Sequence, residues 1–242
     1  MKLLIIRHGD PDYEKDSLTE KGWREAALLA ERMGKTEITD FYVSPLGRAR
    51  DTASLTLEKM GRTAAECDWL QEFPPRILRP DVAPGRMIAW DWLPQDWTAE
   101  PAYFDKERWA STEIMREGHV GEMYDKVVQG LDGVLAEHGY VRNGAFYHTQ
   151  RGNRDVLAFF CHFGVECVLL SHLMNVSPMI LWHHMCAAPS SVTTVYTEER
   201  REGKAVFRVS SFGDISHLYA GGEEPAFSAR FCEICDSGDR HD

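Results

Sequence analysis

Short apolar runs alternate with amphipathic segments along most of the chain. The first run, Leu3 to Ile6, contains no polar residue and predicts a strand that is buried on both faces. Apolar positions then recur at helical spacing from Thr19, a capping residue, to about Met33, and Gly34 marks the end of this helix. The same order of strand and helix recurs along the chain. It predicts an α/β protein in which helices cover both faces of a mostly parallel central sheet.

A second strand and helix follow directly. Phe41 to Val43 predicts the strand, and Ser44-Pro45 predicts the start of a helix that runs to about Met60 and ends at Gly61. Thr63 to Leu70 predicts a third strand. The later predicted elements are a helix over 121–138, a strand over 156–161, a helix over 164–174 and a hairpin with strands over 191–197 and 206–211.

Residues 73–120 break this regularity. Prolines interrupt the stretch, which also carries the four tryptophans Trp90, Trp92, Trp97 and Trp109. Because the chain has no internal repeat and no composition break that requires a second domain, we expect a single domain over 1–242, with this irregular stretch as an insertion. The clustered aromatic side chains favour a small satellite core that holds the insertion down.

Composition narrows the classes of function. The formal net charge of −11 and the sequence pI near 5.4 argue against a nucleic-acid partner, which would need clustered Lys and Arg. No apolar run approaches the ~20 residues that span a bilayer, so we expect no membrane partner. Cysteines inside apolar segments favour reduced thiols in a cytoplasmic protein. Cys232-x-x-Cys235 near His241 has no second pair, and we expect no metal or other cofactor.

Charged side chains stand where three of the predicted strands end. Arg7 and His8 follow the first strand, Arg48 falls in the first turn of the helix after the second, and His162 follows the strand over 156–161. Because the carboxyl ends of parallel strands share one edge of a sheet, we expect these four side chains to converge.

Such a cluster suits phosphate chemistry. Guanidinium groups offer planar donor forks to phosphate oxygens, and the helix starts predicted at Ser44 and Gly164 add oriented N–H groups. A neutral histidine among these cations is a competent nucleophile toward phosphorus, and a second, protonated histidine would stabilise charge in the transition state. The arrangement therefore predicts phosphoryl transfer through a phosphohistidine.

The segments LLIIRHGD, SLTEKGWREA, SPLGRARDTA and CHFG, in this order, closely resemble the histidine phosphatase superfamily, also called the phosphoglycerate mutase-like fold. The resemblance implies a three-layer α/β sandwich in which His8 is the phosphorylated nucleophile and Arg7, Arg48 and His162 bind the phosphate. The general acid of the family usually lies in an L-x-E-type segment after the third strand, where Leu70-Gln71-Glu72 stands. Because Phe73-Pro74-Pro75 replaces the usual continuation, Asp10 is the substitute candidate for the acid.

By this resemblance we expect a metal-independent phosphatase that hydrolyses a small-molecule phosphate monoester. Two alternatives stay open: a phosphotransferase of the phosphoglycerate mutase type, and a catalytically inactive protein of the same fold that binds a phosphorylated ligand. The sequence predicts neither the particular ester nor the oligomeric state. If the insertion over 73–120 is a lid, its aromatic surface would select the organic group of the ester.

Overall fold

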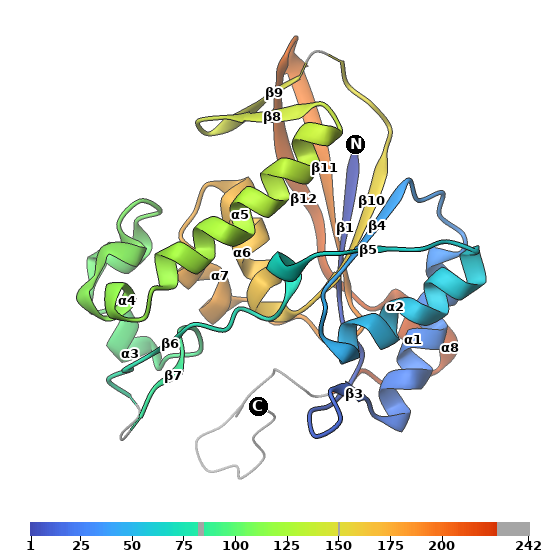
Figure 1. Ribbon diagram of the computed structural model, residues 1–242, viewed down its shortest axis with the longest axis horizontal. Coiled ribbons are helices and arrows are strands. Elements are labelled where there is room, and N and C mark those ends of the chain that lie inside the picture. Colours follow the sequence, from blue (N-terminus) through green and yellow to red (C-terminus); the bar gives the residue numbers. More distant parts are fainter. Residues whose placement is uncertain (82–84, 150, 227–242) are drawn as a thin grey trace.

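The computed structural model describes residues 1–81, 85–149 and 151–226, and its centre is one eight-stranded sheet (Figure 1). Two further pairs of two-residue strands lie apart from it, β2 (Pro11–Asp12) with β3 (Ser17–Leu18) and β6 (Arg76–Ile77) with β7 (Met87–Ile88). The central sheet consists of β1 (Lys2–Arg7), β4 (Asp40–Val43), β5 (Ala65–Glu66), β8 (Tyr140–Asn143), β9 (Phe146–Thr149), β10 (Val156–Cys161), β11 (Val192–Arg201) and β12 (Lys204–Asp214).

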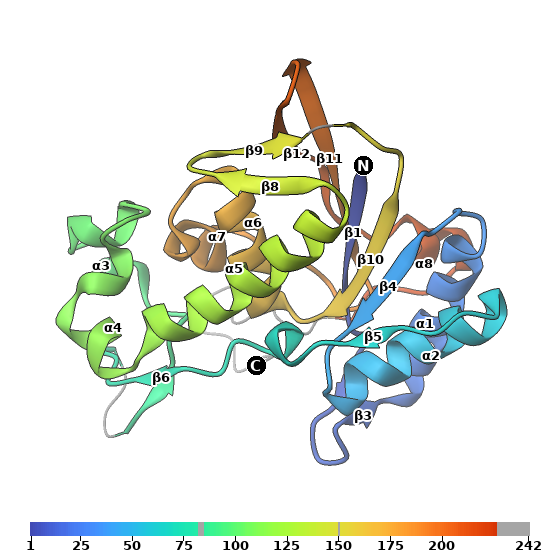
Figure 2. The same ribbon diagram turned by 45° about the horizontal axis from the view of Figure 1, so that its top comes forward.

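Helices cover both faces of this sheet, as predicted. One face carries α1 (Glu20–Met33), α2 (Gly47–Met60) and α8 (Ser216–Gly221), and the other carries α5 (Val120–Glu137), α6 (Phe163–Met174) and α7 (Pro178–His184) (Figures 1 and 2). The apolar run of β1 serves both layers, because successive side chains of a strand point to opposite faces. Leu3 and Ile5 belong to the core cluster on the α5–α6 side, whereas Leu4 and Ile6 belong to the cluster that includes Leu29 of α1.

The strand order is β5-β4-β10-β1-β11-β12-β9-β8. The first four strands run parallel, and the hairpins β11–β12 and β8–β9 extend the sheet with antiparallel strands. Arg7 at the end of β1 lies opposite Cys161, and Phe160 lies opposite Val43 at the end of β4. The carboxyl ends of three strands therefore meet at one edge, where the sequence predicts the site.

Two predicted elements differ from the structure. The helix expected at Ser44-Pro45 begins at Gly47, because Ser44 is held at the edge of the sheet. Its N–H donates to the Phe160 carbonyl of β10, and its hydroxyl contacts the His162 imidazole. The strand expected over Thr63 to Leu70 is limited to β5 and is followed by a 3₁₀ turn over Asp68–Leu70. β5 is short because it lies at the edge of the sheet and pairs with β4 through only two residue pairs.

The insertion contains short elements and buried tryptophans. Trp92, Trp97 and Trp109 are 4%, 0% and 2% exposed and belong to the same core cluster as the α5–α6 layer, so the aromatic core is continuous with the main core rather than a satellite. Trp90 is only partly buried against this cluster. The helices of this stretch are α3 (Pro94–Trp97), α4 (Glu113–Glu117) and 3₁₀ turns over Pro101–Phe104 and Trp109–Ser111.

Neither a membrane helix nor a metal cluster occurs in the part of the chain that the structure describes. None of the described helices has the length and apolar character needed to cross a membrane. Likewise, the described ranges contain no group of three His, Cys, Asp or Glu side chains placed to hold a metal ion. Cys67, Cys161 and Cys167 are free thiols, whereas the predicted Cys232, Cys235 and His241 combination lies outside the described residues.

Candidate active site

His8 stands directly after β1 and is 2% exposed. Its Nδ1 lies 2.7 Å from the Gly9 carbonyl oxygen, which only accepts hydrogen bonds, so Nδ1 carries the proton and Nε2 keeps a free lone pair. Burial, followed by the charges of Arg7 and Arg48, lowers the pKa of His8 well below its usual value. The ring is therefore neutral, and its Nε2 is in the form a nucleophile requires.

His162 caps the start of α6 and lies beside His8, with 5.0 Å between the two ring centroids. Its Nε2 is 2.8 Å from the Ser44 hydroxyl, which itself accepts a hydrogen bond from the Leu46 N–H, so the hydroxyl proton is available to Nε2. Burial, and then the neighbouring His8, Arg48 and Arg7, lower the pKa of His162 well below its usual value. The sequence suggested a protonated second histidine, but this environment favours the neutral ring.

The two predicted arginines approach the histidines from different elements. Nη1 of Arg7, on β1, donates to the Ala187 carbonyl at 2.5 Å. Nη1 of Arg48, on α2, donates to Asp16 Oδ1 at 2.6 Å, and the other oxygen of Asp16 accepts the Gly47 N–H at 2.7 Å. Asp16 thereby fixes both the start of α2 and the direction of the Arg48 side chain.

A buried threonine joins α2 to the loop that carries His8. Thr52 Oγ1 accepts the Gly9 N–H at 2.9 Å and donates to the Arg48 carbonyl at 2.7 Å. Sequence reasoning missed this residue. Its signal is its position four residues after Arg48, since residues so spaced lie on one face of a helix. Ser44 and Asp16 were missed as well, because their partners lie 118 and 32 residues away in the sequence.

The Glu72 side chain lies against the first turn of α6. Its Oε1 accepts hydrogen bonds from the Phe73 N–H at 2.8 Å and the Val165 N–H at 3.2 Å. Burial raises the pKa of Glu72 in spite of these bonds and of Arg48 and Arg7, so a protonated carboxyl is favoured. The structure thus brings the candidate acid to the same edge of the sheet as the two histidines and the two arginines.

The absence of a side chain at Gly164 allows the Glu72 carboxyl to lie this close to the start of α6. A Cβ at this position would lie 2.5 Å from Glu72 Oε1 and 3.0 Å from the Trp90 indole nitrogen, which leaves no room for a side chain. The Trp182 indole N–H donates to the Gly164 carbonyl at 2.9 Å and holds the helix start in place.

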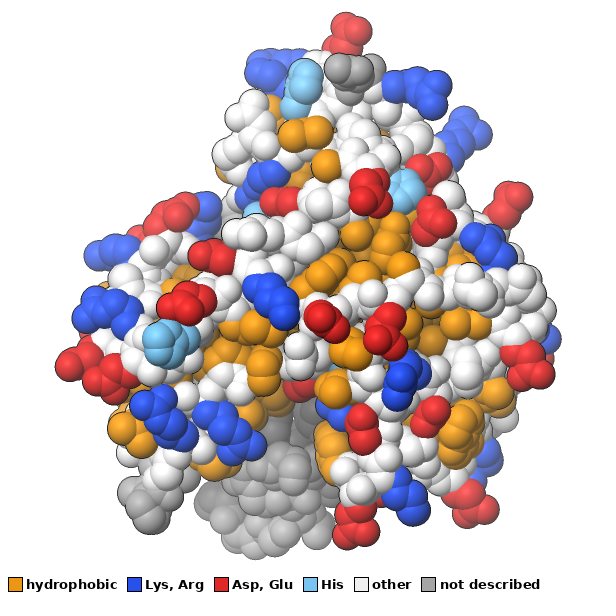
Figure 3. All heavy atoms as spheres, in the orientation of Figure 1, with side chains coloured by type: hydrophobic (Ala, Val, Ile, Leu, Met, Phe, Trp, Pro, Cys, Tyr) orange, Lys and Arg blue, Asp and Glu red, His pale blue; other side chains and the backbone are white. Residues whose placement is uncertain are grey.

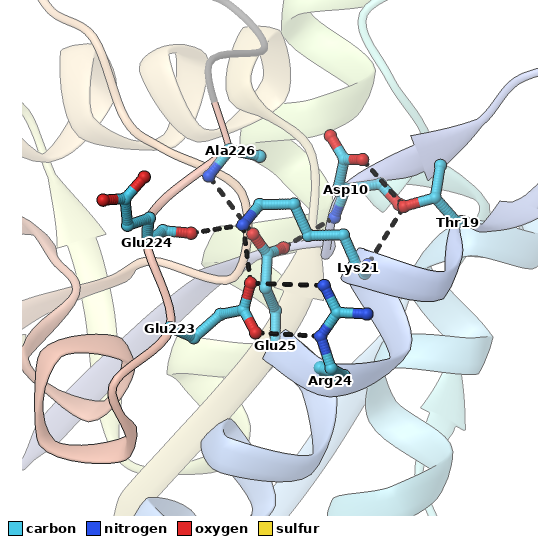
Figure 4. A network of polar contacts seen from close by, with 9 residues as sticks. Asp10, Thr19, Lys21, Arg24, Glu25, Glu223, Glu224 and Ala226 are labelled. Atoms are coloured by element: carbon cyan, nitrogen blue, oxygen red, sulfur yellow. Dashed lines mark hydrogen bonds and ion pairs between the residues drawn. The ribbon is translucent and has the colours of Figure 1, made fainter.

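Asp10, the substitute candidate for the acid, forms hydrogen bonds with a residue of α1 and with the residue that caps this helix. Its carboxylate accepts the Thr19 hydroxyl at 2.7 Å, and its N–H donates to the buried Glu25 carboxylate at 2.8 Å (Figure 4). Glu25 also accepts the Ala226 N–H at 3.3 Å, while Lys21 and Arg24 pair with Glu223. These contacts tie the loop after His8 to the beginning of α1 and to the end of the described chain, and they favour Glu72 as the acid.

Three comparisons with known proteins show what the chain is similar to in sequence. A family model described as histidine phosphatase superfamily (branch 1) matches residues 3–209. A probable phosphatase of Schizosaccharomyces pombe is 24% identical over 247 residues, which cover 90% of this chain and 95% of that protein. A 2,3-bisphosphoglycerate-dependent phosphoglycerate mutase of Thermoplasma acidophilum is 33% identical over 69 residues, and this match spans only 34% of the mutase and 24% of this chain.

A solved structure shows the same fold. The phosphoserine phosphatase of Entamoeba histolytica, determined in complex with 3-phosphoglyceric acid, superimposes with a TM-score of 0.57 at 18% sequence identity. The superposition covers 90% of this chain and 98% of that one. The likeness confirms the predicted α/β architecture.

Proposed function

The chain belongs to the histidine phosphatase superfamily, and from this premise we propose that it hydrolyses a small-molecule phosphate monoester through a phosphohistidine formed on His8. The observation that carries the proposal is the hydrogen bond from His8 Nδ1 to the Gly9 carbonyl, because it leaves Nε2 as the free, neutral nucleophile. Arg7, Arg48 and His162 lie near the His8 ring and would hold the phosphoryl oxygens.

The reaction takes two displacements at phosphorus. His8 Nε2 attacks in line as the ester P–O bond breaks, and the protonated Glu72 carboxyl gives its proton to the leaving alkoxide. The Glu72 carboxylate then takes a proton from water, whose oxygen attacks the phosphohistidine. The P–N bond breaks, inorganic phosphate leaves, and both His8 and Glu72 return to their starting forms.

A mutase is the second candidate, because two of the matching curated proteins are named as phosphoglycerate mutases, one of them as a probable one. A mutase would keep the phosphohistidine long enough to return the phosphoryl group to another hydroxyl. A hydrolase instead exposes it to water activated by Glu72. The match to the probable phosphatase covers 90% of this chain, whereas the matches to the two mutases cover 24% and 36%, and this supports hydrolysis.

The assay is phosphate release from a panel of phosphate monoesters in the presence of a chelator. We expect release by the wild type and none by His8→Ala, while His148→Ala, at an exposed histidine of β9, keeps full activity. A long-lived phosphoenzyme with an isomerised ester and little free phosphate would favour the mutase. Failure of the wild type to turn over any ester, with phosphate binding retained, would favour the inactive ligand-binding protein.

The reduced thiols support the cytoplasmic location that the composition predicts. Labelling of Cys67 by a thiol reagent in freshly lysed cells, without prior reduction, tests this part of the proposal.

A further inference from the structure

Trp90 differs from the other tryptophans of the insertion. Trp92, Trp97 and Trp109 are core residues, whereas Trp90 is partly buried. Its indole Nε1 donates to the Phe73 carbonyl at 3.3 Å, so one edge of the ring is held at the segment that follows Glu72. Its ring also meets the buried Phe163 edge to face, with 6.2 Å between centroids.

The loop that carries Trp90 is braced by buried polar groups. Arg79 Nη1 donates to the Trp90 carbonyl at 3.0 Å, and the Arg79 side chain forms a two-pronged ion pair with Asp81 at 3.0 and 2.5 Å. Two residues after Trp90, the Trp92 N–H donates to His183 Nε2 at 2.9 Å. Because these partners are fixed before any ligand arrives, the indole is preorganised rather than loose.

The indole and the candidate acid lie against the same point of α6. Glu72 Oε1 and Trp90 Nε1 are 2.5 and 3.0 Å from the position that a Cβ on Gly164 would occupy. An acid that protonates a leaving oxygen must contact that oxygen, so the carbon attached to the oxygen lies one bond beyond the acid. The side chain next to the acid therefore meets the organic part of the ester.

We propose that Trp90 is a specificity-determining residue, and that its indole packs against the alcohol portion of the ester so that phosphate esters of aromatic or other flat apolar alcohols are preferred. The inference rests on the proposed function, since it assigns the leaving group to the Glu72 side. An indole face offers a large, rigid apolar surface and no charge, which suits a ring rather than a second anionic group.

The test compares two esters with leaving alcohols of similar acidity, benzyl phosphate and ethyl phosphate, so that the demand on Glu72 is matched. We expect the wild type to prefer benzyl phosphate in kcat/KM by about 10- to 100-fold, the range that apolar contacts give to substrate selection. Trp90→Ala should remove most of this preference by lowering kcat/KM for benzyl phosphate far more than for ethyl phosphate. Trp90→Phe should restore much of it, because an aromatic face remains.

Two controls separate this effect from unfolding. Trp23→Ala removes a tryptophan that is 38% exposed on α1 and should leave the benzyl-to-ethyl ratio unchanged. The inhibition constant of inorganic phosphate should be the same for Trp90→Ala and wild type, because phosphate reaches only the arginines and histidines.

If Trp90→Ala lowered kcat/KM equally for both esters, or if the wild type showed no preference, Trp90 would not determine specificity. If the wild type released phosphate from neither ester nor from 4-nitrophenyl phosphate, the proposed function itself would be wrong.

Discussion

The ring nitrogens of His8 and His162 have different partners, and this difference is consistent with the different roles proposed for the two residues. On His8 a backbone carbonyl binds Nδ1 and leaves Nε2 free, whereas on His162 the Ser44 hydroxyl binds Nε2. His162 Nδ1 is buried without a hydrogen-bond partner among the described residues. A phosphoryl oxygen would supply that partner, so His162 is suited to binding and His8 to attack.

At Glu72, the substitution Glu72→Gln should lower kcat most for esters with poor leaving groups. Gln keeps an oxygen for the Phe73 and Val165 N–H groups but has no acidic proton, and loss of a general acid costs about 10²- to 10⁴-fold. For 4-nitrophenyl phosphate, whose leaving group needs little protonation, the loss should be far smaller. Steady-state rates at one pH with alkyl and nitrophenyl esters measure the contrast.

The matched control for this prediction is Glu66→Gln, on β5, where the side chain is 52% exposed. It should leave both rates unchanged. Equal losses for the two esters in Glu72→Gln would show that this residue positions other groups instead of donating a proton.

Glu166, in the first turn of α6, predicts a pH dependence of stability. Burial raises the pKa of Glu166 to about 7, against the opposing effects of the Thr193 hydroxyl and Arg7. A carboxyl whose pKa is higher in the folded than in the unfolded state binds its proton more tightly when folded. Stability therefore falls as pH rises from about 4.5 to 7 and then levels off. Glu166→Gln should remove this loss.

We expect Glu166→Gln to gain about 2 kcal/mol in unfolding free energy over the wild type between pH 5.5 and 8.5. Urea unfolding at the two pH values measures this, with Glu58→Gln on the exposed side of α2 as a control. An identical difference at both pH values would contradict the assignment.

Among the elements, α1 and the loop after His8 are in backbone contact. A Cβ on Gly22 would lie 2.2 Å from the Asp10 carbonyl oxygen, and a Cβ on Gly9 would lie 2.9 Å from the Gly22 carbonyl oxygen. Gly22 is therefore needed, because only a residue without a side chain lets α1 come into backbone contact with the loop after His8.

Gly22→Ala should therefore reduce both stability and kcat. Overpacking against backbone costs about 1–3 kcal/mol, and the atom that must move belongs to the loop that carries His8. Gly133→Ala is the matched control, because Gly133 lies on the exposed side of α5 with open space at its Cβ position, and it should stabilise the fold by up to about 1 kcal/mol. Thermal unfolding and kcat for the pair decide whether the close contact matters.

Local signals in the sequence predict elements well only where the partner residues are also local. Thr19, whose hydroxyl accepts the Gly22 N–H, caps α1 as predicted. The dipeptide Ser-Pro occurs at both 44–45 and 177–178. Ser177 caps α7 by accepting the Met179 N–H. Ser44 likewise accepts the Leu46 N–H, but it also contacts His162, and α2 begins only at Gly47. Propensity alone cannot separate these cases, because the second contact joins residues that are 118 positions apart.

The hairpin β8–β9 was missed, although Asn143-Gly144 at its turn is a strong hairpin signal. The convergence of Arg7, His8, Arg48 and His162 was predictable because parallel strands end at one edge. The hydrogen bonds of Thr52 and Asp16 were not, because they depend on how α2 packs against the loops before it.

At the scale of the whole molecule, the protein carries a negative net charge but holds two buried arginines close together at the candidate site. Arg7 and Arg48 are 3% and 9% exposed in a chain of net charge −11. Inorganic phosphate should therefore bind specifically and stabilise the folded state. At a concentration 100 times its dissociation constant, it should raise the melting temperature by about 5 to 10 °C.

Arg48→Ala should lose most of this phosphate-dependent shift. Arg50→Ala, at an exposed arginine of the same helix, should keep it. Differential scanning calorimetry with and without phosphate measures the shift, and a single cooperative transition would support the predicted single domain. Equal shifts in the two variants would mean that phosphate acts at another place.

The separation between the proposed phosphate-binding segments and the Trp90 loop has a consequence for how the choice of substrate can change. The groups proposed to bind phosphate and attack phosphorus come from β1, α2 and the β10–α6 junction, whereas Trp90 comes from the insertion that follows Glu72. Because Trp92, Trp97 and Trp109 of the insertion belong to the main core, only a partly buried position such as Trp90 can change without loss of core packing. On the proposed assignment, a single substitution at Trp90 would change the choice of organic group and leave the groups that bind phosphate in place.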